Sequence, residues 1–525
     1  MQFISDPAIA DKIRKMKQRV RWQDPLVAEC GIDQTQLVIA DGRADEPNFS
    51  FLVIGDSGSG PHLDHHPQRE VAELMLPHQP DCRFTLHTGD VVYLTGSSEY
   101  YPKNFIEPYR ELLAGGDRYE KISYREMVFQ QPFFPVLGNH DYYDLPLWFG
   151  LLAATTLPLR SVLESKIDFD LGWRGSDRGD AYARAFLDYL KAFKSPVELR
   201  RHLDRHYTAK TENGDRCLRY EPGTFTRLPN RYYSFRQGGI DFFALDSCTF
   251  NDPIPLPKTH QGDARRRLLE QQRDRLEREK QQFLETASHL DPNNPYEVEQ
   301  LDDLQTKLSQ TDEVLADIKK QLAAHVVPTA DVEQLDWLKQ RLIASWNTPA
   351  VRGRVLYFHH PPYVTESTKW HQAQTLTVRQ HLRRTLDEVA RVVGPLTCGR
   401  PLVDLVLNGH AHCLEHLKTL DTGHADSHIP WIICGGSGFS LRRQRLEGPQ
   451  LLETFPDEEA TESRAVASSQ LFIGRNGKGS HKRRPYSCLR IDVREGAPPQ
   501  FTVRPLIAER YRGKWHRYEH PSFAI

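Results

Sequence analysis

The chain has 525 residues, a length that allows about three average domains or one large core carrying insertions. Charged residues make up 26% of it, and 68 Lys and Arg nearly balance 70 Asp and Glu, for a formal net charge of −2. This composition is typical of a soluble globular protein and excludes a broad basic field. We therefore expect no specific nucleic-acid binding.

The sequence also gives expectations about location. Residues 1–20 contain no apolar stretch of the length that secretory signals need. The most apolar segment, 145–159, is interrupted by Pro146 and Pro158 and is too short to span a bilayer. The eight Cys residues form no C-x-x-C pair, so we expect neither a zinc knuckle nor a disulfide framework. A cytoplasmic protein with reduced thiols and no membrane contact is predicted.

Residues 1–45 are expected to form an N-terminal helical extension, and the core is expected over 46–525. In this core, five short apolar runs each end in a cluster of Gly, Asp, Asn or His. Continuous apolar strands are typical of a sheet covered on both faces, and open α/β sheets place ligands at the carboxyl ends of their strands. The five ends therefore predict one shared site; the runs are FSFLVIGDSGSG (49–60), RFTLHTGDVVY (83–93), FFPVLGNHDYY (133–143), RVLYFHHPPY (354–363) and VDLVLNGHAH (403–412).

Other segments complete a mixed α/β plan. Helical patterns follow the first strand at 68–78 and precede the fourth strand at 332–346. Alternating residues on both sides of Gly238-Gly239 predict a β-hairpin over 232–247. Near the carboxyl end, 487–506 reads as one more strand pair that closes a sheet edge.

Two insertions interrupt the core, at 145–228 and 264–322. The first is rich in helix and loop signals, and Ser195 before Pro196 is the pattern of a helix start. The second has apolar residues at coiled-coil spacing on both sides of the breaker DPNNP, which predicts a helical hairpin with arms of roughly 30 to 40 Å. Its charged faces are expected to be solvated surface, with a protein partner or self-association through 264–322 as the alternative.

The chemistry is expected from six residues that directly follow strands. Any one of them alone would be read as a turn former or a core residue. Together, carboxylates, an amide oxygen and imidazoles form a mixed oxygen and nitrogen donor set, which suits iron, manganese or zinc better than calcium or magnesium. One carboxylate of such a set can bridge two metal ions; the residues are Asp56, Asp90, Asn139, His359, His410 and His412.

The ordered motifs GDSG, GDVVY, GNHD, HHP and GHAH resemble those of the calcineurin-like metallophosphoesterase superfamily, and the subtype is closest to the purple acid phosphatases. Gly58 stands where most of that superfamily has a His ligand, and Tyr93 is the replacement typical of the purple subtype. The motifs span 56–412, so the resemblance covers the core without the insertions. It implies an α/β fold, a four-layer αββα sandwich of two mixed sheets.

The resemblance also implies how the metals would be held. One metal would be bound by Asp56, Asp90, Tyr93 and His412, and the other by Asp90, Asn139, His359 and His410, with Asp90 as the bridge. A phenolate ligand favours ferric iron by charge and hardness, which leaves a divalent iron, manganese or zinc for the second position. The alternative for Tyr93 is an aromatic residue that only packs at a strand end.

The expected reaction is metal-dependent hydrolysis of a phosphate monoester by a hydroxide bound at the dinuclear centre. His140 is the candidate for stabilising developing charge or protonating the leaving oxygen, and Asp141 is expected to orient it. His360 is expected either near the ligands or exposed.

Several alternatives stay open. The same ligands could hydrolyse phosphodiesters, including nucleotides. In another class of function, the chain would act as a scaffold through its helical hairpin, or as a metal-stabilised module that binds phosphate without cleaving it. The basic strings at 442–445 and 481–484 could attract an anionic substrate, although short charge runs are usually solvated.

Overall fold

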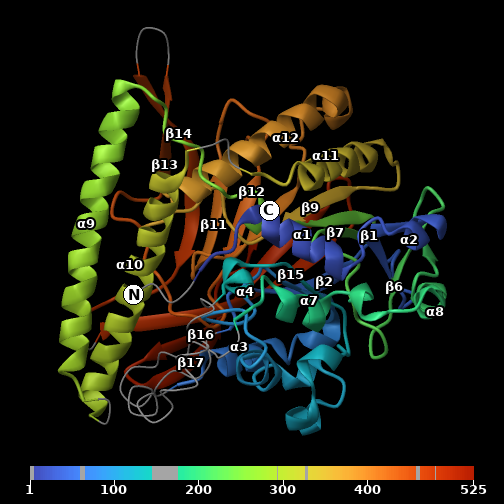
Figure 1. The fold of residues 1–525 in the computed structure, drawn as a ribbon, viewed down its shortest axis with the longest axis horizontal. Coiled ribbons are helices and arrows are strands. Elements are labelled where there is room, and N and C mark those ends of the chain that lie inside the picture. The colour runs from blue at the N-terminus through green and yellow to red at the C-terminus, as the bar shows by residue number, and fades with distance from the viewer. Residues whose placement is uncertain are drawn as a thin grey trace.

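The computed structural model describes residues 5–58, 65–144, 175–291, 294–325, 329–456, 461–478 and 481–525. These segments form two mixed β-sheets that pack face to face, with helices on the outer faces (Figure 1). The predicted αββα sandwich of two mixed sheets is confirmed. The part of the first predicted insertion over 145–174 lies outside the described residues.

The larger sheet contains eleven of the described strands. Its central strands run parallel to one another, and antiparallel strands flank them on both sides. The order is β13 (Gln450–Pro456), β14 (Thr461–Ile473), β11 (Leu414–Thr419), β12 (Pro430–Cys434), β10 (Leu405–Asn408), β9 (Gly353–Tyr357), β8 (Ile240–Ala244), β7 (Tyr233–Gln237), β1 (Ile32–Ile39), β6 (Arg216–Tyr220) and β5 (Ala209–Lys210).

The smaller sheet contains seven of the described strands. The three motif-bearing strands β2, β3 and β4 run parallel, and the carboxyl-terminal strands continue the sheet in antiparallel fashion. The order is β17 (Lys514–Glu519), β16 (Gln500–Tyr511), β15 (Arg483–Arg494), β2 (Phe49–Ile54), β3 (Cys82–His87) and β4 (Phe133–Pro135), and β18 (Phe523–Ala524) pairs with β16.

Helices cover the outer faces of the two sheets. Leu342 and Leu382, from two long helices, join Trp431 of the larger sheet in one apolar cluster, while a short helix after the first motif packs against β15 and β16. The described α-helices are α1 (Ile9–Arg19), α2 (Pro25–Glu29), α3 (Pro67–Met75), α4 (Asn139–Tyr142), α7 (Asp180–Phe186), α8 (Pro196–His206), α9 (His260–Ser288), α10 (Pro295–Ala323), α11 (Val332–Asn347) and α12 (Ala373–Thr397).

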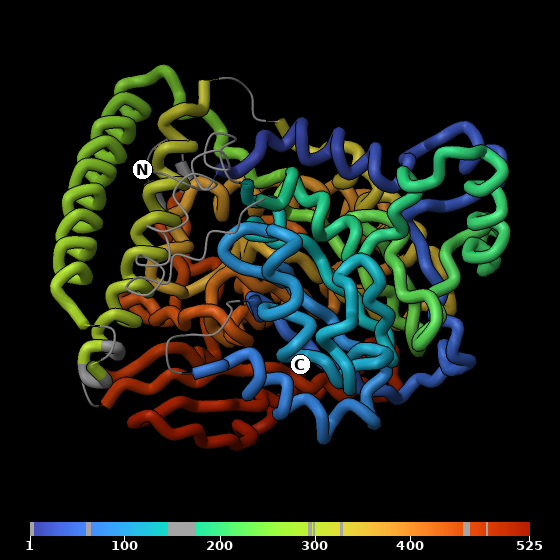
Figure 2. Tube along the Cα trace, turned by 60° about the horizontal axis from the view of Figure 1, so that its bottom comes forward, coloured from blue at the N-terminus to red at the C-terminus, as the bar shows by residue number. Residues whose placement is uncertain are grey.

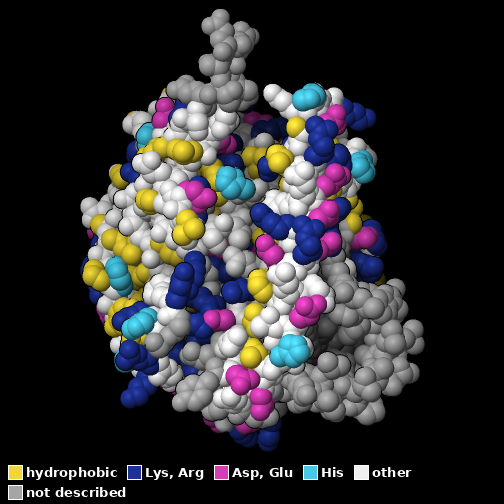
Figure 3. All heavy atoms as spheres, turned by 90° about the vertical axis from the view of Figure 1, so that its left-hand side faces the viewer, with side chains coloured by type: hydrophobic (Ala, Val, Ile, Leu, Met, Phe, Trp, Pro, Cys, Tyr) yellow, Lys and Arg dark blue, Asp and Glu magenta, His cyan; other side chains and the backbone are white. Residues whose placement is uncertain are grey.

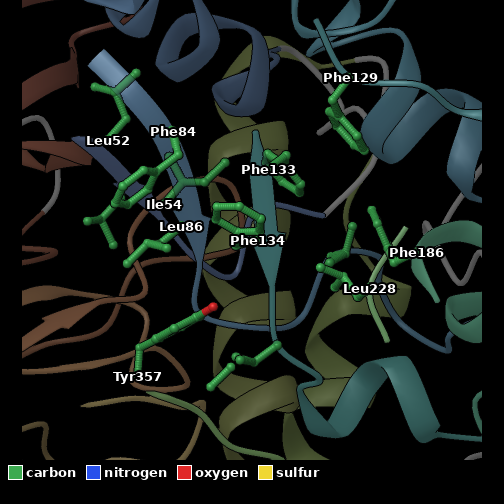
Figure 4. Packing of buried hydrophobic residues seen from close by; sticks show 14 of the residues in the cluster. Leu52, Ile54, Phe84, Leu86, Phe129, Phe133, Phe134, Phe186, Leu228 and Tyr357 are labelled. Atoms are coloured by element: carbon green, nitrogen blue, oxygen red, sulfur yellow. The ribbon is translucent and has the colours of Figure 1, made fainter. Parts of the chain in front are cut away.

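The main core lies between the two sheets and is rich in aromatic residues (Figure 4). Phe84 of β3 meets Phe242 of β8 edge to face, with ring centroids 5.2 Å apart, and also contacts Phe134 of β4. Such pairs add to the free energy that area burial alone provides. Because the sheets are fixed on each other here, the carboxyl ends of β2, β3 and β4 are held beside those of β9 and β10.

The described residues include a tight hairpin turn and a capped helix start. The hairpin of β7 and β8 turns at Gly238 and Gly239, whose φ angles of 57° and 74° both lie in the left-handed region that a two-residue hairpin turn uses. Ser195 caps α8 by accepting a hydrogen bond from the backbone N–H of Val197. Residues 1–45 contain strand β1 as well as α1 and α2, so this segment contributes to the larger sheet.

The insertion over 264–322 forms two antiparallel helices, α9 and α10, along one side of the core (Figures 1 and 2). Leu301 and Leu304 of α10 form an apolar cluster with Ala287 of α9. The face of the molecule that includes α9 carries Lys, Arg, Asp and Glu side chains of both signs (Figure 3). The helical hairpin is therefore present, while coiled-coil packing and self-association through it stay predictions.

Within the described residues, no helix combines the length and the apolar character that a bilayer crossing requires. The cytoplasmic location stays a prediction. All eight Cys residues are free thiols in this structure.

A buried carboxyl in β11 gives a prediction for stability. Burial raises the pKa of Glu415 from 4.5 to about 7, although hydrogen bonds from Thr365 oppose the shift. The resulting stability is fully present below pH 4.5 and is lost as the pH rises through 7, because the folded chain must then bury a charge. We expect Glu415→Gln to match the wild type at pH 4 and to exceed it at pH 8 by up to about 3 kcal/mol in unfolding free energy. Urea unfolding at pH 4 and pH 8 measures the difference in unfolding free energy between the variant and the wild type. The same difference at both pH values would contradict the prediction.

Candidate metal centre

Five strand ends converge on one buried cluster of polar side chains. Asp56 follows β2, Asp90 and Tyr93 follow β3, and Asn139 opens α4 after β4. The histidines come from the larger sheet, after β9 and β10. Each of the seven predicted ligands has at most 5% of its surface exposed; they are Asp56, Asp90, Tyr93, Asn139, His359, His410 and His412.

One group of donor atoms surrounds the Tyr93 hydroxyl. Tyr93 Oη lies 2.6 Å from Asp90 Oδ2, 3.0 Å from Asp56 Oδ1 and 3.1 Å from His412 Nε2. His412 Nε2 is also 3.4 Å from Asp56 Oδ1. These are the four residues that the resemblance implies for the first metal.

A second group surrounds the Nε2 atom of His359. This atom lies 3.0 Å from Asn139 Oδ1, 3.2 Å from His410 Nδ1 and 3.2 Å from Asp90 Oδ2. The same oxygen of Asp90 therefore takes part in both groups. The Nδ1–H of His359 donates to the carbonyl of Thr88 at 2.9 Å, which fixes the ring so that Nε2 faces the cluster.

The donor spacing fits metal ions. Ligand atoms at about 2.0 to 2.2 Å from one ion lie about 3 Å from each other, which is the spacing within both groups. Two groups of side chains in this region have ligand atoms close enough together to hold an ion: Asp56, Asp90 and His359, and the three histidines His359, His360 and His410. A dinuclear centre with Asp90 between its two halves is consistent with these distances.

The pKa values of the donor groups are strongly shifted by burial and by their neighbours. Burial, together with the charge of Asp90, raises the pKa of Asp56 to about 8. Burial alone would raise the pKa of Asp90 and lower that of His359. The attraction between the two groups outweighs burial, so the pKa of Asp90 is lowered and that of His359 is raised to about 9. The pKa of the Tyr93 phenol is raised by burial and by both carboxylates. Metal cations bound here would place positive charge beside these buried carboxylates and the phenol.

The backbone is strained at these positions. Four of the seven predicted ligands have φ in the left-handed region: Asp56 at 52°, Asp90 at 56°, His410 at 68° and His412 at 48°. Residues with a side chain rarely adopt such angles, and sites of function are where the strain concentrates. The glycine of the GNHD motif allows close approach, because a Cβ on Gly138 would lie 2.1 Å from Asp90 Oδ1.

The structure places His140 beside the cluster. Its backbone N–H donates to Asp90 Oδ1 at 2.8 Å, and its ring packs on Tyr93 with centroids 4.1 Å apart. The expected orienting contact with Asp141 is replaced by another, because the ring Nδ1 bonds the carbonyl of Leu94 at 2.6 Å. Burial lowers the pKa of His140 below its usual value.

Asp141 has a different task from the one predicted. Its carboxylate accepts hydrogen bonds from the backbone N–H groups of Gly138 at 2.9 Å, Asp90 at 3.0 Å and Val91 at 3.1 Å. The carboxylate thus ties the GDVVY loop to the GNHD turn. It positions two predicted ligands through the backbone.

His360 is buried and lies next to His410, with ring centroids 4.5 Å apart. Its Nδ1 is 2.8 Å from Ser247 Oγ, and its Nε2 is 3.4 Å from Asn251 Nδ2. Both nitrogens therefore have partners on the segment after β8.

Some groups at the centre were missed by the sequence analysis. Phe439 stacks on Tyr93, with centroids 4.1 Å apart and an angle of 10° between the rings. Lys369 and Glu313 contact His410 although neither belongs to a motif, and no pattern in the sequence predicts these contacts. Arg442, from a basic string expected to be solvated, is only 3% exposed and lies against His412.

No protein-family model matches the sequence, and no curated protein matches it. Among solved structures, the chain is similar to the purple acid phosphatase PPD1 from yellow lupin (Lupinus luteus) seeds, with 11% identity, a TM-score of 0.38, and coverage of 92% of this chain and 54% of that one. PhoD gives a TM-score of 0.39 at 11% identity over 92% and 70% of the two chains. GAP50, the anchor in the inner membrane complex of Plasmodium, gives 0.34 at 13% identity over 90% and 88%. The chain spans about half the length of the lupin phosphatase.

Proposed function

We propose that this chain is a metal-dependent phosphoesterase with a dinuclear centre, of the calcineurin-like metallophosphoesterase type, and that it hydrolyses phosphate monoesters. The observation that supports this most directly is the position of Asp90 Oδ2, which lies within 3.2 Å of both Tyr93 Oη and His359 Nε2. A carboxylate oxygen shared by two groups of donors is the arrangement that a pair of bridged cations needs.

The donor chemistry bears on the metals. Tyr93, Asp56, Asp90 and His412 would hold one ion, and we propose ferric iron there because a phenolate is a hard, anionic ligand. Asp90, Asn139, His359 and His410 would hold a divalent iron, manganese or zinc ion. When bound, such a pair of ions supplies the positive charge that activates water at neutral pH and polarises the phosphoryl group.

The protein's own residues supply the remaining steps. His140, at the edge of the donor cluster, would deliver a proton to the leaving oxygen. Asp141 keeps His140 and Asp90 in place through the hydrogen bonds that it accepts from the loop. The strained backbone at the ligands holds the donor atoms in position before substrate arrives, which avoids reorganisation during the reaction.

Turnover of two chromogenic esters tests the proposal. Chelator-stripped protein is given iron, manganese or zinc, and hydrolysis of p-nitrophenyl phosphate is compared with that of bis-p-nitrophenyl phosphate. We expect turnover only with metal, and a higher kcat/KM on the monoester. Faster hydrolysis of the diester would instead support a phosphodiesterase, and no turnover by folded, metal-loaded protein on either ester would overturn the proposed function.

A further inference from the structure

The ring of His410 is contacted on its outer side by residues from outside the motifs. Its Nδ1 lies 3.2 Å from Nε2 of His359 and so faces the donor cluster, while its Nε2 points away from the cluster. Three side chains surround this outer nitrogen: Lys369 Nζ lies at 2.9 Å, and Gln374 Nε2 and Glu313 Oε1 each lie at 3.4 Å. Because His410 is only 3% exposed, the protein itself must provide the hydrogen-bond partner of this nitrogen.

All three of these side chains are tied to α10, the second helix of the hairpin. Glu313 belongs to α10, and its carboxylate also contacts the amine of Lys369. Gln374 lies in the first turn of α12, where its backbone N–H donates to Asp317 of α10 at 3.1 Å. The surroundings of the outer nitrogen of His410 are therefore built by an insertion.

α10 meets the core along a polar stripe. Gln310 Nε2 donates to Ser367 Oγ at 3.1 Å. One turn of α10 beyond Asp317, Lys320 pairs with Asp252 at 2.8 Å. The residues of the stripe follow one another at alternating spacings of four and three, and each contacts the core through a polar atom; they are Thr306, Gln310, Glu313, Asp317 and Lys320. Such spacing keeps one face of a helix toward the core, so the stripe directs Glu313 at the metal centre.

We propose that Glu313 is a positioning residue of the metal centre, and that the helical hairpin thereby takes part in holding the ion bound by His410. The inference rests on the proposed function, from which it takes the two metal positions. A histidine that offers Nδ1 to a metal carries its proton on Nε2, and an acceptor for this proton fixes the ring. Glu313 supplies the acceptor, because its Oε1 approaches Nε2 and the Lys369 amine contacts both groups.

The effect of Glu313 should be confined to one of the two ions. A carboxylate beside the outer N–H of a ligand histidine keeps the ring in its orientation and raises its basicity, so the metal is bound more tightly. His410 belongs to the donors around His359 Nε2. Among the described contacts, Glu313 touches none of the four donors around Tyr93 Oη. Loss of its carboxylate should therefore weaken the second metal position and leave the first unchanged.

Zinc binding to chelator-stripped protein, measured by competition with a chromogenic chelator, tests this positioning in the absence of substrate. We expect Glu313→Gln to bind one zinc ion as the wild type does and the other about tenfold or more weakly. The same substitution made in His410→Ala should have no further effect on zinc binding, because the ring on which Glu313 acts is gone. A general weakening of the fold by Glu313→Gln would instead lower zinc binding in both backgrounds.

Two control variants separate positioning from docking of the hairpin. Asp302→Asn removes an ion pair with Arg484 at 2.6 Å, which fastens α10 about three turns before Glu313. Asp312→Asn removes a charge from the side of α10 that pairs with Lys280 of α9. Both variants should bind two zinc ions as the wild type does.

The outcomes separate this inference from the proposed function. Wild-type affinity for both ions in Glu313→Gln, or an equal loss in Asp302→Asn, would show that these contacts only fasten the hairpin and would overturn the inference. If Glu313→Gln does not fold, Glu313→Asp decides, since it keeps the charge but withdraws the carboxylate from His410, and it should show the same loss. A wild type that binds both ions and cleaves neither ester would overturn the proposed function and leave this inference standing.

Discussion

Asp90→Asn should lose both metal ions and at least about a thousandfold in kcat/KM, the largest effect of any single substitution in this chain. Asparagine keeps the shape of the side chain and can still accept the backbone N–H of His140, which bonds Asp90 Oδ1 at 2.8 Å. Asparagine cannot supply the negatively charged oxygen that Asp90 shares between the donors around Tyr93 Oη and those around His359 Nε2. Metal content by atomic emission, measured beside hydrolysis, reports the two losses separately.

Two further variants make this result specific. Asp117→Asn removes a carboxylate that is 78% exposed, and it should leave metal content and rate unchanged. His412→Ala removes a donor from the Tyr93 group alone, so we expect it to keep about one ion per chain. Full metal occupancy in Asp90→Asn would mean that Asp90 is not the shared ligand.

The positions of the motifs could be predicted because of a property of parallel strands. Asp56, Asp90 and Asn139 each follow a short apolar run, and such strands end at a common edge of their sheet. The histidines after β9 and β10 belong to the other sheet, so their meeting with these residues depends on how the two sheets pack. The five strand ends predicted one shared site, whereas the division of its residues between two metal ions came from the resemblance of the ordered motifs to a known family.

Contacts within a motif were harder to predict. Adjacency in the sequence suggested that Asp141 orients His140, yet the two side chains leave α4 in different directions. Asp141 is the third residue of α4 and accepts the backbone N–H of Gly138, as an acidic residue at that position of a helix commonly does. The capping pattern was thus a signal for the role that the structure shows.

The contribution of the hairpin could not be predicted from periodicity. Heptad spacing identifies which residues of α9 and α10 face each other, but it does not say which polar face meets the rest of the protein. Glu313 has the sequence environment of any solvated helix residue, and its approach to Lys369 and Arg442 depends on tertiary docking. Arg442 was misjudged for the same reason, because a basic string is solvated only when no acidic element covers it.

His140→Ala should reduce the rate according to the leaving group of the ester. The ring is held by the Leu94 carbonyl at Nδ1 and by packing on Tyr93, and no described residue bonds its Nε2. Burial lowers the pKa of His140, so its protonated form is a stronger acid than free imidazolium. If Nε2 protonates the leaving oxygen, phenyl phosphate should lose about a thousandfold in kcat, because phenolate leaves poorly without a proton. p-Nitrophenyl phosphate, whose leaving group needs no proton, should lose about tenfold or less.

Metal content and the slope of rate against leaving-group acidity decide the role of His140. The backbone N–H that bonds Asp90 Oδ1 is retained in the alanine variant, so both ions should stay bound. Asp141→Asn weakens the loop that carries both residues without removing the ring, and it should slow the two esters by the same factor. An equal loss on both esters in His140→Ala would assign His140 to charge stabilisation, since a group that binds phosphoryl oxygens acts on every substrate alike.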